Sequence, residues 1–210
     1  MVEPIQAEGG DHHASAAFFR GLQAIAKKYE AAFIVDEVQT GCGATGKFWA
    51  YEHWGLECPP DFVTFSKKML TGGYYYKSEY RPDQGYRIYN TWVGDPSKLL
   101  LLEAVICTIK EQNLLEFVTT SGDRLMKGLA ALQSMFPEKV KNVRGEGTFV
   151  AFDAASAPAR DKLIGKLRNH GVQVGGCGDA AIRFRPALIF QPNHVDVFLN
   201  IFEDVLLHDK

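Results

Sequence analysis

Two short apolar runs, each followed by a charged residue, constrain the fold of this chain more than any other feature. The run 33–35 leads into Asp36, and the run 62–65 leads through Ser66 to Lys67. Both runs are rich in β-branched and aromatic residues, which is typical of strands covered on both faces of a parallel sheet. Because open parallel sheets bind ligands at the carboxyl ends of their strands, we expect Asp36 and Lys67 to face one crevice.

A lysine and a carboxylate in this arrangement suit a pyridoxal phosphate site. The lysine forms a Schiff base with the cofactor aldehyde, and the carboxylate keeps the pyridine nitrogen protonated so that the ring accepts electrons. Because the amine must be neutral to attack, we expect Lys67 in a desolvated pocket. For Lys67 and Lys68 taken alone, a solvated surface position is an open alternative. The following Gly72 and Gly73 would let the backbone pass close to a flat ligand.

The composition indicates a folded chain that acts on small molecules. Its 210 residues are 46% hydrophobic and 12% aromatic, which suffices for the core of one large domain or two small ones. The 23 basic and 25 acidic residues nearly cancel, so neither nucleic acid nor a membrane surface is an expected partner. The four cysteines lie far apart, which argues against disulfides and favours a reducing compartment. No apolar stretch approaches the roughly 18 residues of a membrane span.

The remaining sequence predicts an α/β fold in which helices and strands alternate. Strands are expected at 32–36, 62–65, 148–152 and 181–185, and a turn at 175–178. Helices are expected over 18–29, 95–109, 114–135, 159–170 and 195–207. Asp11 or Ser15 would cap the first helix, and Asp95 the second. A change of character near residue 113 predicts two domains, 1–113 and 114–210.

The acidic pair Asp36-Glu37 also suits the magnesium-binding strand of a nucleotide hydrolase. The segment 41–48 even contains the pattern G-x-x-x-x-G-K. However, Phe48 stands where that motif needs Ser or Thr, and the acidic pair precedes the loop on the same strand. We therefore interpret the glycines of this segment as the means to form a tight loop.

Two arginines near the end of the chain are candidates for binding a carboxylate. Arg183 and Arg185 lie two residues apart on an expected strand, so their side chains share a face. A guanidinium on a half-buried strand can hold a substrate carboxylate with two hydrogen bonds, and a structural salt bridge is the open alternative. His12 and His13 are adjacent and lack the usual spacing of metal ligands, so we predict no metal site.

Several segments together resemble the class III aminotransferases, which are fold-type I pyridoxal phosphate enzymes. They are VDEVQTG at 35–41, DFVTFSK at 61–67 and TGG at 71–73, with EPIQAEGGDHHAS near the start and GGCGDAAIRFRP near the end. The resemblance implies part of the large domain of that fold, a mostly parallel sheet with flanking helices, followed by a smaller α+β C-terminal domain.

The resemblance also implies a role for each cofactor-binding residue. The family lysine stands six residues after the aspartate of a D-x-x-T-x-x-K pattern, which gives Lys67 as the covalent lysine and Lys68 as a bystander. By the same mapping, Asp36 pairs with the pyridinium nitrogen and Gln39 lies near the phenolic oxygen of the ring. Thr91 would reach the cofactor phosphate of the neighbouring subunit, so a homodimer is expected.

The substrate side follows from the same resemblance. Arg183 would bind the α-carboxylate of glutamate or 2-oxoglutarate, and Glu8 would pair with Arg183 when the donor has no α-carboxylate. The segments are most similar to mitochondrial matrix members of the family that use 4-aminobutyrate, which implies a ping-pong reaction giving succinate semialdehyde and L-glutamate. An ornithine or β-alanine donor stays open as an alternative. A non-catalytic, truncated partner that docks through the Thr91 region is another.

In the family, several site elements precede the EPIQ segment. They are the loop that cradles the phosphate, an aromatic residue that stacks on the ring, an arginine for the γ-carboxylate, and cysteines of an iron–sulfur cluster. We therefore expect this chain to correspond to the C-terminal portion of the family's proteins, without their targeting segment. We also expect the 210 residues alone to bind the cofactor poorly and to turn over little.

Overall fold

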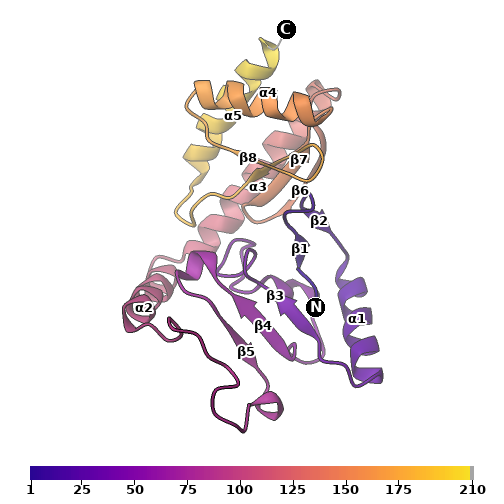
Figure 1. Ribbon diagram of the computed structural model, residues 1–210. Helices are drawn as coiled ribbons and strands as arrows, with labels where there is room; N and C mark the ends of the chain where they lie inside the picture. Colours follow the sequence, from indigo (N-terminus) through magenta and orange to yellow (C-terminus); the bar gives the residue numbers. More distant parts are fainter. Residues whose placement is uncertain (209–210) are drawn as a thin grey trace. The chain divides into compact units, whose positions relative to one another are not determined.

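The computed structural model describes residues 1–208, which divide into two compact units (Figure 1). Unit 1 contains residues 1–4, 14–42 and 49–113, and unit 2 contains residues 5–13, 43–48 and 114–208. The chain passes from unit 1 to unit 2 between Asn113 and Leu114, where the sequence predicts a boundary. Two earlier segments, 5–13 and 43–48, also belong to unit 2. Their backbones are bonded there: Gly178 N–H donates to Glu8 O at 3.0 Å, and Thr148 N–H to Ala44 O at 3.1 Å.

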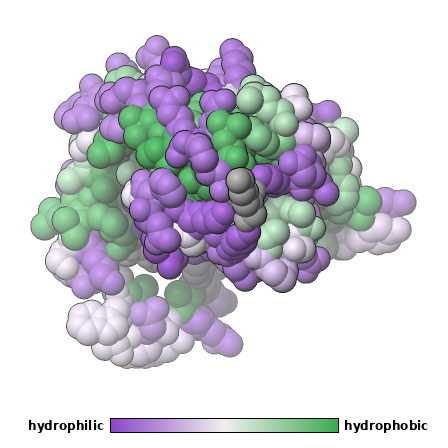
Figure 2. Space-filling model, turned by 90° about the horizontal axis from the view of Figure 1, so that it is seen from above, coloured by the Kyte–Doolittle hydropathy of each residue, from purple (hydrophilic) through white to green (hydrophobic). Residues whose placement is uncertain are grey.

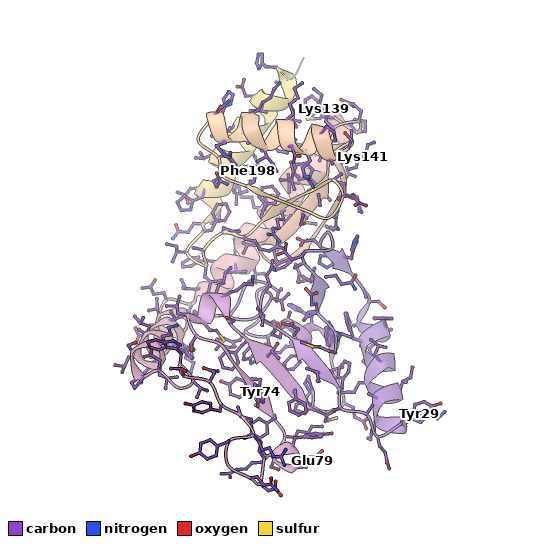
Figure 3. All side chains as sticks on the ribbon, in the orientation of Figure 1. Tyr29, Tyr74, Glu79, Lys139, Lys141 and Phe198 are labelled. Carbon is purple, nitrogen blue, oxygen red and sulfur yellow. The ribbon has the colours of Figure 1, made fainter. Side chains whose placement is uncertain are left out.

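Unit 1 is built on a three-stranded sheet (Figure 1). Its order is β3 (Ile34–Asp36), β4 (Phe62–Phe65), β5 (Gly73–Tyr76). β3 and β4 are parallel, and β5 runs antiparallel to β4. The β5 residue Tyr74, labelled in Figure 3, is exposed. The central pair is thus the parallel pair that the sequence predicts, and the third strand reverses direction.

Helix α1 packs against the sheet of unit 1. Phe19 of α1 (Ala16–Lys28) packs on β3 in a buried cluster with Phe33, Val35 and Trp54. The Ser15 hydroxyl caps α1 by accepting a hydrogen bond from Phe18 N–H at 3.2 Å, so Ser15 and not Asp11 is the cap. The other helices of unit 1 are η1 (Ala50–Trp54), η2 (Lys67–Met69), η3 (Ser78–Tyr80) and α2 (Pro96–Glu111).

Unit 2 is a four-stranded antiparallel sheet packed against helices. The strand order is β6 (Lys141–Glu146), β7 (Phe149–Asp153), β9 (Ala181–Phe184), β8 (Gly175–Cys177). The helices are α3 (Leu114–Met135), α4 (Ala157–Asn169) and α5 (Pro192–Leu207). They enclose a core of fully buried side chains such as Leu129, Phe152, Ile182 and Phe202, together with the nearly buried Phe198 that Figure 3 labels. A small hairpin, β1 (Ile5–Gln6) and β2 (His12–His13), completes the unit.

Two strands of the four-stranded sheet differ from the sequence-based expectations. The segment predicted as a turn at 175–178 contains β8, because its backbone pairs with β9 in a register that sets Gly176 opposite Ile182. β6 was not predicted because its sequence, KNVRGE, lacks an apolar run. It is an edge strand, and its residues are exposed or half-buried, so a polar sequence suits it.

These elements confirm the predicted α/β class. None of the helices among residues 1–208 combines the length and the apolar character needed to cross a membrane. Figure 2 shows hydrophobic areas in green between hydrophilic side chains in purple on the face it presents. Among the exposed large apolar residues of unit 2 are Ile189, Val197 and Leu207.

Candidate active site

β3 and β4 bring Asp36 and Lys67 to the same edge of the sheet in unit 1. Asp36 is the last residue of β3 and lies opposite Thr64 in the parallel register. Lys67 follows Thr64 by three residues, just beyond the end of β4. Both residues therefore stand at the carboxyl ends of adjacent parallel strands, the edge at which such sheets bind ligands.

The Asp36 carboxylate is oriented by two hydrogen bonds to the same oxygen. Oδ1 accepts the backbone N–H of Val38 and the hydroxyl of Thr64, both at 3.0 Å. Because both bonds within the described residues reach Oδ1, the second oxygen remains available to a further donor. A carboxylate oxygen, which accepts hydrogen bonds, fits the protonated pyridine nitrogen of pyridoxal phosphate, which would donate one. Thr64 was not predicted as a site residue, since its contact with Asp36 depends on the strand register.

Lys67 is held in a tight backbone turn directly after β4. Its φ angle is +51°, in the left-handed region that residues other than glycine seldom adopt. Its carbonyl accepts the N–H of Leu70 at 2.8 Å, and Leu70 is also left-handed, with φ at +59°. The Lys67 side chain is exposed, so the expectation of a desolvated amine is not met within these residues.

A second carboxylate, Glu37, lies buried directly after Asp36. Only 1% of Glu37 is exposed, and its Oε2 accepts the Thr40 hydroxyl at 2.5 Å while Oε1 accepts the Tyr51 N–H at 2.8 Å. Burial raises the pKa of Glu37 and outweighs these hydrogen bonds, which lower it. Glu37 thus ties the turn after β3 to η1. That turn carries Gln39, which is half-buried.

Thr91 is exposed in the segment 90–95 that leads to α2. The preceding Asn90 shapes this segment, because its Oδ1 accepts the N–H of Trp92 at 3.0 Å. The predicted contact of Thr91 with the cofactor phosphate of a neighbouring subunit stays a prediction.

In unit 2, Arg183 and Glu8 form an ion pair. Arg183 lies on β9, and Glu8 lies in the segment between β1 and β2. Arg183 Nη1 donates to Glu8 Oε1 at 2.7 Å. The Glu8 side chain is 70% exposed and that of Arg183 is 22% exposed. Burial lowers the pKa of Arg183, but the hydrogen bond and the charge of Glu8 more than offset this and raise it overall. The two residues assigned to the substrate carboxylate therefore meet.

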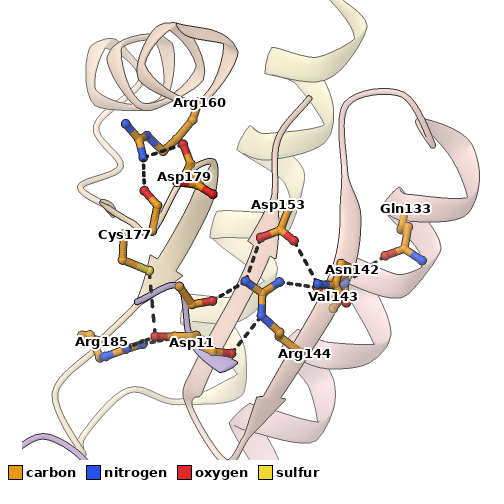
Figure 4. Close-up of polar contacts among 12 residues, drawn as sticks. Asp11, Gln133, Asn142, Val143, Arg144, Asp153, Arg160, Cys177, Asp179 and Arg185 are labelled. Atoms are coloured by element: carbon orange, nitrogen blue, oxygen red, sulfur yellow. Dashed lines mark hydrogen bonds and ion pairs between the residues drawn. The ribbon is translucent and has the colours of Figure 1, made fainter. Parts of the chain in front are cut away.

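Arg185 has a different partner, Asp11, which sequence reasoning considered only as a helix cap. Arg185 donates to both carboxylate oxygens of Asp11, at 2.9 and 2.5 Å (Figure 4). Asp11 is fully buried. For Arg185 the structural alternative, a salt bridge, is the correct one. The sequence offers only an indirect signal for it, since Gly9 and Gly10 mark a sharp turn before the aspartate.

Comparison with known proteins identifies the family. The family model described as Aminotransferase class-III matches residues 1–206. The chain belongs to the class III aminotransferases. This confirms the resemblance drawn from the sequence motifs, and with it the class III fold.

Relatives of this class III aminotransferase chain are similar to it over its whole length. It is 57% identical over 210 residues to mitochondrial 4-aminobutyrate aminotransferase of Sus scrofa. It is 52% identical over 206 residues, 98% of the chain, to 4-aminobutyrate aminotransferase of Dictyostelium discoideum. In each comparison the chain spans 42% of the relative's length.

A solved structure also matches this class III chain closely. Lysine aminotransferase from M. tuberculosis superposes with a TM-score of 0.91 at 32% sequence identity. The match covers 98% of this chain and 48% of that one. The described residues thus account for less than half of each of these proteins.

Proposed function

We propose that this chain is part of a pyridoxal phosphate aminotransferase that moves the amino group of 4-aminobutyrate to 2-oxoglutarate. The products are succinate semialdehyde and L-glutamate. The observation that carries the proposal is the position of Asp36 and Lys67 at the carboxyl ends of adjacent parallel strands. The 57% identity to the pig 4-aminobutyrate aminotransferase supports this amino donor, and the relative's mitochondrial name supports the mitochondrial matrix as the location.

The residues of unit 1 divide the work of holding the cofactor and moving a proton. Pyridoxal phosphate, when bound, supplies an electron-accepting ring that stabilises negative charge on the amine-bearing carbon of the substrate. Lys67 would hold the cofactor through its Nζ, and the same amine would move a proton at that carbon of the substrate. Asp36, which accepts a hydrogen bond from the Thr64 hydroxyl, would keep the pyridine nitrogen protonated. Gln39 would bind the phenolic oxygen of the ring.

Arg183 and Glu8 allow one site to accept two kinds of substrate. Arg183 binds the α-carboxylate of glutamate or 2-oxoglutarate, since a guanidinium matches the geometry of a carboxylate. 4-Aminobutyrate has no α-carboxylate, and Glu8 then neutralises Arg183 through the ion pair that the structure contains. The exchange of Glu8 for a substrate carboxylate suits a ping-pong cycle in which both substrates use the same site.

We also propose a homodimer in which Thr91 reaches the cofactor phosphate of the neighbouring subunit. The exposure of the segment around Thr91 supports this assembly, because Tyr89 and Trp92 are 72% and 75% exposed. Large apolar side chains exposed together are typical of surfaces that bind another protein.

The test compares the 210-residue chain with a fusion in which the upstream portion of the pig relative precedes it. With pyridoxal phosphate and borohydride, the fusion should carry a stable cofactor label on Lys67, located by peptide mass spectrometry. It should also transfer the amino group of 4-aminobutyrate, and Lys67→Ala should abolish both results. The chain alone should label weakly, because its Lys67 is exposed. A label on a different lysine would overturn the assignment.

The amino donor is tested separately with the same fusion. 4-Aminobutyrate, ornithine and β-alanine are compared through the absorbance change of the cofactor, and 4-aminobutyrate is expected to react fastest. Preference for ornithine or β-alanine would contradict the proposed donor and leave the class chemistry intact. The non-catalytic alternative would be favoured by two results together. The fusion would be inactive, and the inactive chain would co-purify with a complete subunit.

A further inference from the structure

The segment Ile5–His13 presents two carboxylates to two arginines of unit 2. Glu8 pairs with Arg183 and Asp11 pairs with Arg185. The two pairs differ in burial, because the Glu8 side chain is 70% exposed whereas that of Asp11 is 0% exposed. An exposed pair exchanges its partner easily, but breaking a buried pair leaves an uncompensated charge in the interior. The pair of Asp11 is therefore the fixed one.

The contact between Asp11 and Arg185 has the geometry of a permanent anchor. Two parallel hydrogen bonds join Asp11 Oδ2 to Arg185 Nη1 and Asp11 Oδ1 to Arg185 Nη2 (Figure 4). The guanidinium also lies over the ring of Phe149, with its central carbon 3.3 Å from the ring centroid. Phe149 is fully buried, so Arg185 is held on one side by a carboxylate and on the other by the core.

Arg144 fixes the backbone of the same turn. Its Nε donates to the carbonyl of Asp11 at 2.9 Å, and its Nη2 donates to the carbonyl of Gly10 and to Asp153 (Figure 4). Asp11 itself has a left-handed backbone, with φ at +54°. At the other end of the turn, Glu8 O accepts the N–H of Gly178 at 3.0 Å. The course of residues 8–11 is therefore set by contacts on both sides of Glu8.

We propose that Asp11 is a positioning residue for Glu8. Anchored on Arg185, Asp11 holds the turn 8–11 so that Glu8 stays within hydrogen-bonding reach of Arg183. Asp11 thereby sets how readily Arg183 exchanges Glu8 for a carboxylate ligand. The positioning depends only on contacts within unit 2, and the consequence for ligands rests on the proposed function of Arg183.

The variant Asp11→Asn tests the positioning in the 210-residue chain without cofactor or activity. Asparagine tolerates the left-handed backbone as aspartate does, so the substitution removes chiefly the charge. The readout is the set of guanidinium NMR signals of Arg183, which report whether its rotation is hindered by Glu8. Asp11→Asn should move these signals toward those of Glu8→Gln. The matched control is Asp196→Asn, which removes a surface pair with Arg124 in the same unit and should leave the signals unchanged.

A titration with 2-oxoglutarate, followed on the same signals, tests the consequence. Because Glu8 competes for Arg183, Asp11→Asn should tighten binding about two- to fivefold, the range expected for losing an exposed ion pair. In the Glu8→Gln background, Asp11→Asn should have no further effect. An effect of equal size in both backgrounds would mean that Asp11 does not act through Glu8, and the proposal would be overturned.

Two further outcomes keep this proposal separate from the proposed function. If Glu8→Gln does not tighten 2-oxoglutarate binding, the role of Arg183 with substrate fails, and the guanidinium signals still decide the role of Asp11. If Asp11→Asn does not fold, Arg144→Lys takes its place, because lysine keeps the charge but lacks the fork that holds both Gly10 and Asp11. Unchanged Arg183 signals in a folded Asp11→Asn or Arg144→Lys chain would overturn the positioning.

Discussion

Asp36 and Glu37 are consecutive carboxylates with separate tasks. At the end of a strand, successive side chains point to opposite faces. Asp36 is half-buried and keeps one oxygen available to a ligand, whereas Glu37 is buried and bound to Thr40 and Tyr51. One carboxylate is therefore placed where the proposed cofactor would bind, and its neighbour secures the turn that supports it.

Glu37 should make the stability of unit 1 depend on pH. Burial raises its pKa above the ordinary value of 4.5, so the folded chain binds a proton more readily than the unfolded chain. The resulting stabilisation is complete below pH 4.5. It should be lost as the pH rises through the folded pKa, at about 1.4 kcal/mol per pH unit between the two pKa values.

The measurement is urea denaturation of the wild-type chain and Glu37→Gln between pH 4 and 8. Because glutamine does not titrate, the free energy of unfolding of Glu37→Gln relative to wild type should increase with pH. A difference that stays constant, or that shrinks as the pH rises, would show that Glu37 does not carry this dependence.

Thr64 should matter to the chemistry only through Asp36. Thr64→Val keeps the shape of the side chain but removes the hydroxyl that donates to Asp36 Oδ1. Because a hydrogen bond to a charged group is worth about 1.5–3 kcal/mol, the fusion with the pig upstream portion should lose roughly ten- to a hundredfold in kcat or in cofactor affinity. Thr119→Val removes a hydroxyl that donates to Leu115 O within its own helix in unit 2, and it serves as the control. Equal losses in both variants would argue against the role of Thr64.

At the scale of the elements, local signals predicted what local interactions determine. α2 begins as expected because Asp95 accepts the N–H of Ser97 at 2.9 Å and Pro96 occupies the first helical position. β8 and β6 were not predicted, because their strand character comes from pairing with β9 and β7 and not from their own residues.

The same distinction holds for the candidate site. The position of Asp36 and Lys67 at adjacent strand ends was predictable, because each follows its own apolar run and parallel strands gather such ends. The Thr64 contact was not predictable, since it joins residues 28 apart and depends on the strand register. Nor was the Asp11 contact, which spans 174 residues and needs the complete sheet of unit 2.

Helix α3 should tolerate no side chain at Gly122. A Cβ there would lie 2.1 Å from the carbonyl oxygen of Gly147, a backbone atom that cannot move aside easily. Gly122→Ala should therefore lower the free energy of unfolding by roughly 1–3 kcal/mol. Gly165→Ala in α4 is the matched control, because a Cβ at that position meets nothing within 4 Å. The control should raise stability by about 0.5–1 kcal/mol.

Urea denaturation of both glycine variants decides the matter. Opposite signs of the two changes would confirm that the close packing of α3 on the β6–β7 turn sets the requirement. A loss of similar size in both variants would instead indicate a general cost of altering helices in unit 2.

At the scale of the whole molecule, unit 1 exposes an unusual amount of apolar surface on α2. Leu99, Leu100 and Leu101 are consecutive and are 49%, 67% and 53% exposed. A helix with apolar residues around most of its circumference is normally buried. The described residues leave Leu99, Leu100 and Leu101 of α2 exposed, which makes this helix suited to bind another chain.

The isolated 210-residue chain should therefore self-associate through α2. Leu100→Lys places a charge at the centre of the exposed apolar run. For each Leu100 side chain that the association buries, the substitution should weaken the free energy of association by roughly 1 kcal/mol or more. Sedimentation equilibrium at several protein concentrations measures the shift. Leu207→Lys on α5 is the control, because Leu207 is 60% exposed in unit 2, and this variant should associate like wild type. If Leu207→Lys weakened association as much as Leu100→Lys, general solubility rather than the α2 surface would account for the effect.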